Sequence, residues 1–214
     1  MRRPGTSVHR WLAAVAVAAV VSSACHDEGD VRVESLKFDG NHAFKSSRLA
    51  EVVVTRATGR MPWARPRFFS RPVFEADLDR LKAFYSDRGY PDARVTSTDV
   101  NFNEKRDAVD LRIHLDEGAP LIVERVTFTG LDQAPPDLKE ALDSVPLRVG
   151  LPRDRSFVAG ARERVTFLLH DHGYPHARVG SSEAAGSQPK TVIVTIAVTM
   201  GAPATFGDVS GVGL

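Results

Sequence analysis

The feature of this chain that most constrains its fold is an internal repeat. Gly89 and Gly173 lie in nearly identical stretches of sequence, 84 residues apart. Three such anchors recur in the same order and at matching spacings: RGYPDARV at 88–95 and HGYPHARV at 172–179, EGAP at 117–120 and MGAP at 200–203, and an apolar pattern ending in Phe-x-Gly at 38–40 and 128–130. Repetition at a fixed period indicates duplicated structural units. The repeat therefore predicts two similar domains rather than one undivided domain.

Each unit carries the pattern of the same secondary-structure elements. An opening strand at 31–39 or 122–129 is followed by two segments with apolar residues at helical spacing. The second helix is expected to end at Gly89 or Gly173, because glycine adopts the left-handed conformation and the proline two residues later prevents continuation. A hairpin closes the unit, and its last strand, at 109–115 in the first copy, alternates apolar and polar residues. This alternation predicts one buried and one solvated sheet face.

The elements predict an α+β fold of two tandem β-α-α-β-β domains, each a three-stranded mixed sheet covered on one face by two helices. We expect Ser46 or Ser47 to cap the first helix, and Pro136 to lie in the first turn of its counterpart. The predicted boundaries are a first domain at 31–120, a second domain at 121–203, and the start of a truncated third repeat or a barrel linker at 204–214.

The N-terminus has the pattern of a secretory signal peptide. Three arginines precede an apolar run at 11–21, and small residues follow it. A transmembrane helix needs about 20 apolar residues, so this run is too short to remain in a membrane as a span. We predict a signal peptide at 1–24 and a polar tether at 25–30.

Cys25 is the only cysteine of the chain, and it directly follows the small residues of the leader. The stretch VSSAC resembles the lipobox of bacterial lipoproteins, in which the cysteine thiol is acylated and becomes the new N-terminus. Ser22 stands where Leu or Val is commoner, and Ser22 with Ala24 equally suits ordinary signal peptidase. Both a lipid-anchored and a plainly exported protein are therefore compatible with the sequence.

The repeated motifs resemble the POTRA (polypeptide-transport-associated) domain, the periplasmic repeat of BamA/TamA-type outer-membrane assembly proteins. The likeness rests on Phe38-Asp39-Gly40-Asn41, on Phe84-Tyr85 before Gly89-Tyr90, on Phe128-Thr129-Gly130 and on Gly173-Tyr174. It implies a periplasmic protein associated with the outer membrane, whose partners are unfolded outer-membrane protein clients or a β-barrel assembly partner. Family members normally continue into further repeats and a membrane β-barrel, whereas this sequence stops at Leu214.

The resemblance also implies where a partner would bind. In the family, the strand after Gly-Tyr lies at a sheet edge, which corresponds here to Ala93–Asn103 and Ala177–Ser182. An extended segment of a client can add to such an edge as another strand. We expect the first segment to be the better docking edge, with the contact residues Ala93, Val95, Ser97, Asp99, Asn101 and Asn103. The alternative is a structural spacer, or a lipoprotein adaptor for a separate barrel, whose edges bind nothing.

A basic and aromatic segment interrupts the first unit between its two helices. Residues 56–72 hold five arginines, no acidic residue, one tryptophan and two phenylalanines. Such segments suit an anionic membrane surface or a partner protein. The candidate contact residues are Arg60, Trp63, Arg65, Arg67, Phe68 and Phe69. The alternative is a long interhelix connection whose aromatic residues pack on their own domain.

The remaining composition excludes several classes of function. The net charge is +1 and gives no general bias toward nucleic acid, and one cysteine excludes an internal disulfide. His170, His172 and His176 cluster in the sequence, so metal binding is a second alternative. The equivalent positions of the first unit hold other polar residues, Ser86, Arg88 and Asp92. This difference favours variation of a solvent-exposed surface over a metal site. No nucleophile motif, phosphate-binding loop or carboxylate pair is recognisable, so we expect neither an enzyme nor a cofactor.

Overall fold

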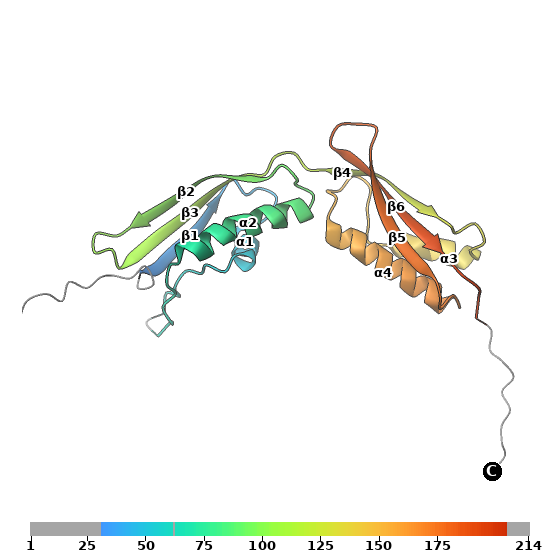
Figure 1. Ribbon diagram of the computed structural model, residues 1–214, viewed down its shortest axis with the longest axis horizontal. Coiled ribbons are helices and arrows are strands. Elements are labelled where there is room, and N and C mark those ends of the chain that lie inside the picture. Colours follow the sequence, from blue (N-terminus) through green and yellow to red (C-terminus); the bar gives the residue numbers. More distant parts are fainter. Residues whose placement is uncertain (1–30, 62, 205–214) are drawn as a thin grey trace, which may run out of the picture.

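A computed structural model describes residues 31–61 and 63–204, which form two α+β domains one after the other (Figure 1). The element order of the two domains is the same, and both follow the predicted β-α-α-β-β pattern. The first domain contains β1 (Arg32–Asp39), α1 (Ser46–Val52), α2 (Arg71–Asp87), β2 (Arg94–Phe102) and β3 (Ala108–Asp116). The second contains β4 (Ile122–Thr129), α3 (Pro136–Ala141), the 3-10 turn η2 (Leu142–Ser144), α4 (Arg155–Asp171), β5 (Arg178–Ala185) and β6 (Thr191–Thr199).

Each domain has a three-stranded mixed sheet with its last strand in the centre. The strand orders are β1-β3-β2 and β4-β6-β5. The central strand is parallel to the opening strand and antiparallel to its hairpin partner. The helices cover one face of each sheet, as Figure 1 shows, which confirms the predicted fold class.

The alternation of the central strands explains their position. Leu111 and Ile113 of β3 are buried, with at most 1% of their surface exposed, and Val194 and Ile196 of β6 are fully buried. They pack against apolar residues of the long helices, such as Leu81 of α2, in two separate cores. Burial of one such aliphatic side chain contributes about 1.5–3 kcal/mol. Each domain is therefore held by its own apolar core, which in the first domain also contains Phe38, Phe69, Phe74 and Tyr85.

The helix ends agree only in part with the sequence predictions. Gly89, just after α2, has φ +91°, the left-handed conformation expected of a C-terminal glycine. Pro136 is the first residue of α3, as predicted. The predicted serine cap of α1 is wrong: Ser46 is already helical, and the cap residue Lys45 makes no side-chain hydrogen bond.

Several sequence predictions concern residues outside the described ranges. These are the signal peptide at 1–24, Cys25 with the tether at 25–30, and all of the third-repeat or linker segment except Ala204. Within residues 31–61 and 63–204, no helix is long and apolar enough to cross a membrane.

Candidate functional site

The outer edge of β1 is partly occupied by the chain itself. The Val33 amide donates to the Arg67 carbonyl at 2.7 Å, and the Val33 carbonyl accepts from the Thr58 amide at 2.8 Å. The Phe69 amide donates to the Val31 carbonyl at 2.7 Å. The interhelix segment of the first domain thus lies against the first half of β1 and uses its free backbone groups.

The second domain covers the edge of β4 in the same way. The Val123 amide donates to the Leu151 carbonyl at 2.9 Å, and the Gly150 amide donates to the Val123 carbonyl at 2.8 Å. The Arg153 amide donates to the Leu121 carbonyl at 2.7 Å. In both domains the segment before the long helix therefore occupies the start of the opening strand.

The opposite edges, β2 and β5, are open: each is paired only with its central strand among the described residues. An open edge exposes a row of backbone donors and acceptors that another strand can use. This asymmetry leaves each domain with one edge that is open along its whole length, and both of these edges are the strands that follow Gly-Tyr.

The six contact residues predicted for the first edge differ in their positions. Val95, Ser97, Asp99 and Asn101 lie in β2, whereas Ala93 precedes the strand and is buried in the core, with 4% exposed. Asn103 follows the strand, and its side chain accepts from the Asp107 and Ala108 amides in the turn to β3. Ala93 is therefore a core residue, and Asn103 is an exposed residue of the turn; neither lies in the edge strand itself.

The two open edges also differ in regularity. The pairing of β2 with β3 shifts register between Val95 and Ser97, and such irregularities make an edge less suitable for pairing with another strand. The pairing of β5 with β6 is regular from Arg178 to Ala185. A regular edge of mostly small residues is the more accessible template.

A groove beside β5 was not predicted from the sequence. It has a volume of about 390 Å³ and is lined by residues of α4 and by Val179 of β5. Its largest apolar side chain is Phe167, which is 58% exposed. Phe167 lies outside the apolar stripe of α4, and the repeat places Ala83 at the equivalent position in the first domain. This difference between the two copies is the sequence feature from which the groove could have been predicted.

The basic segment of the first domain exposes most of its predicted contact residues. Trp63 is 79% exposed, Phe68 is 53% exposed, and the side chains of Arg60, Arg65 and Arg67 also face solvent. Phe69 differs from the prediction. It is 2% exposed, and its ring lies 5.9 Å from that of Phe74 and 6.4 Å from that of Phe102.

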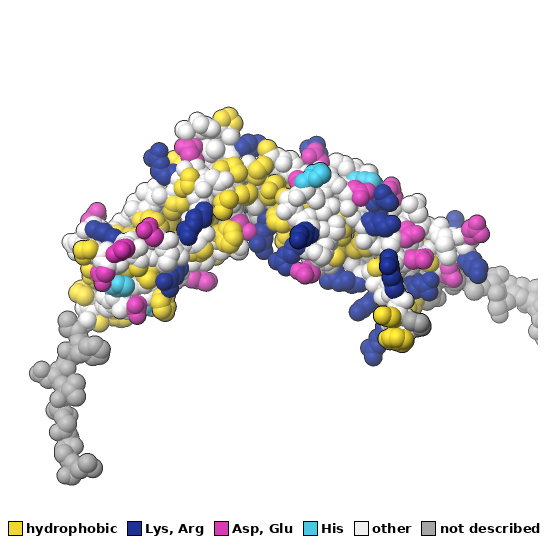
Figure 2. Space-filling model, turned by 180° about the vertical axis from the view of Figure 1, so that it is seen from behind, with side chains coloured by type: hydrophobic (Ala, Val, Ile, Leu, Met, Phe, Trp, Pro, Cys, Tyr) yellow, Lys and Arg dark blue, Asp and Glu magenta, His cyan; other side chains and the backbone are white. Residues whose placement is uncertain are grey.

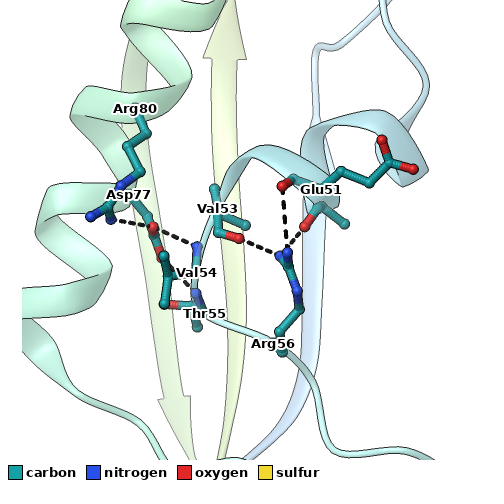
Figure 3. Close-up of polar contacts among 8 residues, drawn as sticks. Glu51, Val53, Val54, Thr55, Arg56, Asp77 and Arg80 are labelled. Atoms are coloured by element: carbon teal, nitrogen blue, oxygen red, sulfur yellow. Dashed lines mark hydrogen bonds and ion pairs between the residues drawn. The ribbon is translucent and has the colours of Figure 1, made fainter.

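The start of this segment is fixed by Asp77 of α2 (Figure 3). The Asp77 carboxylate, which is fully buried, accepts from the Val54 amide at 2.7 Å and from the Thr55 amide at 2.8 Å. Arg80 pairs with the same carboxylate at 2.7 Å. Burial by itself raises the pKa of Asp77, but the hydrogen bonds from Thr55, Val54 and Arg80 outweigh it, so the pKa lies below its ordinary value.

Arg56 has a structural role that the sequence did not reveal. Its guanidinium donates to the carbonyls of Ala50, Glu51 and Val53 at the end of α1, as Figure 3 shows in part. A cation at the C-terminus of a helix satisfies carbonyls that lack helical partners. Arg56 therefore caps α1 and differs in role from the exposed arginines that follow it.

The histidines of the alternative metal-binding hypothesis have other neighbours in the structure. Nδ1 of His172 lies 2.7 Å from the Leu168 carbonyl, and its Nε2 lies 3.4 Å from the Asp137 carboxylate. His170 lines the groove beside β5. In the described part of the chain, no three His, Cys, Asp or Glu residues are grouped so that they could hold a metal ion. The placement of His172 therefore argues against a site made with His170 and His176.

Polar contacts join the two domains directly. The Gly89 carbonyl accepts from the Leu121 amide at 2.7 Å, and Arg88 pairs with Asp154 at 2.8 Å. A second ion pair, also at 2.8 Å, joins Arg155 to Asp87. Burial by itself raises the pKa of Asp154. The hydrogen bonds from Ser156 and Arg88 lower this pKa by more than burial raises it, so it lies below its ordinary value.

The first of the two repeats matches a known protein family. Residues 31–118 match the model of the POTRA family, which is described as a surface antigen variable number repeat. This match covers the first domain and confirms the resemblance drawn from its motifs.

A curated relative and solved structures are similar over most of the chain. The outer membrane protein assembly factor BamA of Neisseria meningitidis serogroup B is 23% identical over 170 residues, which cover 78% of this chain and 21% of the relative. The chain thus spans about a fifth of that protein. The POTRA3-5 structure of Haemophilus influenzae BamA is 24% identical, with a TM-score of 0.46, and the match covers 81% of this chain and 67% of that one. The N-terminal domain of Omp85 from Thermosynechococcus elongatus is 15% identical, with a TM-score of 0.34. That match covers 79% of this chain and 66% of the other.

Proposed function

We propose that this chain is a periplasmic protein-interaction module that serves outer-membrane protein assembly or translocation. In this proposal, extended segments of unfolded outer-membrane clients, or of a β-barrel partner, add as strands to β2 and β5. The observation that carries it is the asymmetry of the edges. Backbone groups of β1 and β4 are used by the chain itself, whereas β2 and β5 are open.

The chemistry of an edge suits partners of varied sequence. Added strands are bound by backbone hydrogen bonds, which carry no sequence code, and specificity comes from pockets for alternate side chains. The groove with Phe167 lies beside β5 and would receive an apolar side chain of the added strand. Because outer-membrane strands alternate apolar and polar residues, such segments match an edge next to an apolar groove.

The relatives support the cellular setting of this proposal. The curated relative is named as an outer membrane protein assembly factor, and the first domain matches the POTRA family. Export by the signal peptide at 1–24 would place the chain in the periplasm, and acylation of Cys25 would hold it at a membrane. Both remain predictions from the sequence.

Amide hydrogen exchange with a synthetic barrel-strand peptide tests the binding mode. We expect the peptide to slow exchange at amides of β5 and β2 and to leave those of β1 and β4 unchanged. An inert spacer would show no protection at any strand, and binding with protection only elsewhere would also overturn the proposal.

The variant Phe167→Ala tests the groove separately. We expect peptide affinity to fall about tenfold, as for the loss of one well-packed apolar contact. Phe157→Ala is the matched control, because Phe157 is also an exposed phenylalanine of α4, at 44%, but does not line the groove. Equal effects of the two substitutions would contradict a role for the groove.

A further inference from the structure

We propose that the basic segment of the first domain binds the surface of an anionic phospholipid bilayer. The arginine loop, defined as residues 58–61 and 63–68, would place Trp63 and Met61 among the lipid headgroups. Arg60, Arg65 and Arg67 would contact lipid phosphates. This site is separate from the sheet edges and does not depend on them.

The charge of the loop is one-sided. Between Glu51 and Glu75 the sequence contains five arginines and no acidic residue. No ion pair to another described residue involves Arg60, Arg65 or Arg67. Arg60 and Met61 also line a groove against the sheet, where the acidic residues Glu34 and Asp110 are balanced by Arg32 and Lys37. The loop itself therefore remains cationic and complements an anionic surface.

The apolar side chains of the loop have no cover within the described protein. Trp63 is 79% exposed, Met61 is 60% exposed and Phe68 is 53% exposed. Figure 2 shows the loop as a projection below the first domain, with hydrophobic and basic side chains together at its tip. Tryptophan is enriched at membrane interfaces because its ring is amphipathic, and arginine can bury its stem while its charge contacts phosphate. This combination favours a lipid surface over a purely acidic protein surface.

The loop is held in shape by its own hydrogen bonds. Asp77 fixes the amides of Val54 and Thr55 before the loop begins. The Arg67 amide donates to Oγ1 of Thr58 at 3.0 Å and closes the base of the loop. The Ala64 amide donates to the Met61 carbonyl at 2.9 Å and forms a turn at the tip. A preformed loop loses less conformational entropy on binding, which favours a surface site of few residues.

The second domain lacks this construction. Its connection between η2 and α4 runs over residues 145–154, against 53–70 in the first domain. Ala161, fully buried, occupies the position equivalent to Asp77. The longer loop and the aspartate that fixes it therefore occur together in one copy only, as expected if they form one functional unit.

The loop also lies close to the N-terminal end of the domain. It returns to β1 where the Phe69 amide bonds to the Val31 carbonyl. Five residues lie between Cys25 and Val31, and the six steps from one Cα to the next can span at most about 20 Å. If Cys25 is acylated, the same membrane would be within reach of the loop.

Tryptophan fluorescence tests the proposal with a site-specific probe. The chain has two tryptophans, and the chain without residues 1–24 retains only Trp63. We would use that chain with Cys25→Ser, so that no acyl group contributes, and titrate it with vesicles. We expect a blue shift with phosphatidylglycerol-containing vesicles, a loss of the shift at high salt, and no shift with pure phosphatidylcholine.

Charge variants separate the loop from general attraction. We expect Arg60→Gln, Arg65→Gln and Arg67→Gln together to weaken vesicle binding about a hundredfold, or about fivefold for each cation removed. The control combines Lys105→Gln, Arg106→Gln and Arg125→Gln, which remove the same charge from exposed residues elsewhere. Equal weakening by both triple variants would overturn the proposal.

Two further outcomes would also overturn it. One is the absence of a blue shift with anionic vesicles, and the other is a shift with soluble polyglutamate but not with vesicles, which would assign an acidic protein partner. Peptide protection at β2 and β5 is measured without lipid, so failure of the proposed function would be seen independently.

Discussion

Asp77 joins two separate segments of the first domain. It is a fully buried carboxylate without a buried cation, since Arg80 is 45% exposed, and its remaining partners are two backbone amides. A buried charge is tolerated only when it is hydrogen-bonded, because desolvation otherwise costs several kcal/mol. The carboxylate thus links α2 to the segment that follows α1.

We predict that Asp77→Asn destabilises the protein by about 1–3 kcal/mol at neutral pH, since an amide leaves one buried N–H without an acceptor. Asp79→Asn, on the exposed side of the same helix, should stay within about 0.5 kcal/mol of the wild type. Urea unfolding of the three proteins measures the difference. Similar stabilities for both variants would contradict the role of Asp77.

The pH dependence of this contribution follows from its lowered pKa. The folded pKa of Asp77 lies below the ordinary value, so its contribution is fully present above the unfolded pKa of about 3.9. It is lost as the pH falls through the folded pKa. We therefore expect the stability gap between wild type and Asp77→Asn to narrow below about pH 4, in urea titrations at pH 7 and pH 3. A gap of constant size would contradict the prediction.

A second polar contact, which is partly buried, differs between the two copies. The Tyr85 hydroxyl donates to the Glu117 carboxylate at 2.8 Å, and burial followed by that hydrogen bond raises the pKa of Tyr85. The equivalent residues of the second domain are Leu169, which is buried in its core, and Met200, which packs against that core. The repeat thus uses a polar pair in one copy and an apolar pair in the other.

This exchange predicts strong coupling between the two sites. Glu117→Met alone leaves a buried hydroxyl without an acceptor, and Tyr85→Leu alone leaves a cavity, so each should cost about 1–3 kcal/mol. The double variant, which copies the second domain, should cost less than the sum of the two. A double-mutant cycle of unfolding free energies measures the coupling. Strict additivity would show that the pair does not act as a unit.

At the scale of elements, the interhelix segment of the first domain both covers the edge of β1 and carries the arginine loop. We predict that Thr58→Ala, which removes the Oγ1 acceptor of the Arg67 amide, speeds exchange of that amide and changes overall stability by less than about 1 kcal/mol. Thr58→Ser keeps the acceptor and should exchange like the wild type. Unchanged exchange in Thr58→Ala would show that the base of the loop is held by other contacts.

The strands and long helices could be predicted because their signals are local. Alternation in β3 and β6, the glycines after α2 and α4, and the repeat itself each depend on neighbouring residues. The sequence did not reveal Asp77, Arg56 or the covered edges, because these depend on contacts between segments far apart in the chain. For the same reason the sequence left open whether Phe69 is a contact residue or packs on its own domain, and the structure places it in the core beside Phe74 and Phe102.

The whole molecule depends on the joint between the domains. A Cβ added at Gly89 would lie 2.8 Å from the Arg153 nitrogen, so the joint tolerates only glycine there. The same backbone bond recurs at the end of the second domain, where the Ala204 amide donates to the Gly173 carbonyl at 2.8 Å. The joint is therefore part of the repeat, and it sets the relative direction of the two open edges that a long client would contact.

The two glycines offer a matched test of this joint. Gly89 and Gly173 have φ of +91° and +85°, so substitution by alanine strains both by about 1–2 kcal/mol. Only Gly89→Ala also places a Cβ against the other domain, because the nearest atom at Gly173 is the Ala204 carbonyl oxygen at 3.8 Å. We expect Gly89→Ala to change the angle between the domains, measured by residual dipolar couplings, and Gly173→Ala to leave it unchanged. If both variants kept the wild-type angle, contacts other than Gly89, such as the Arg88–Asp154 pair, would have to determine the orientation.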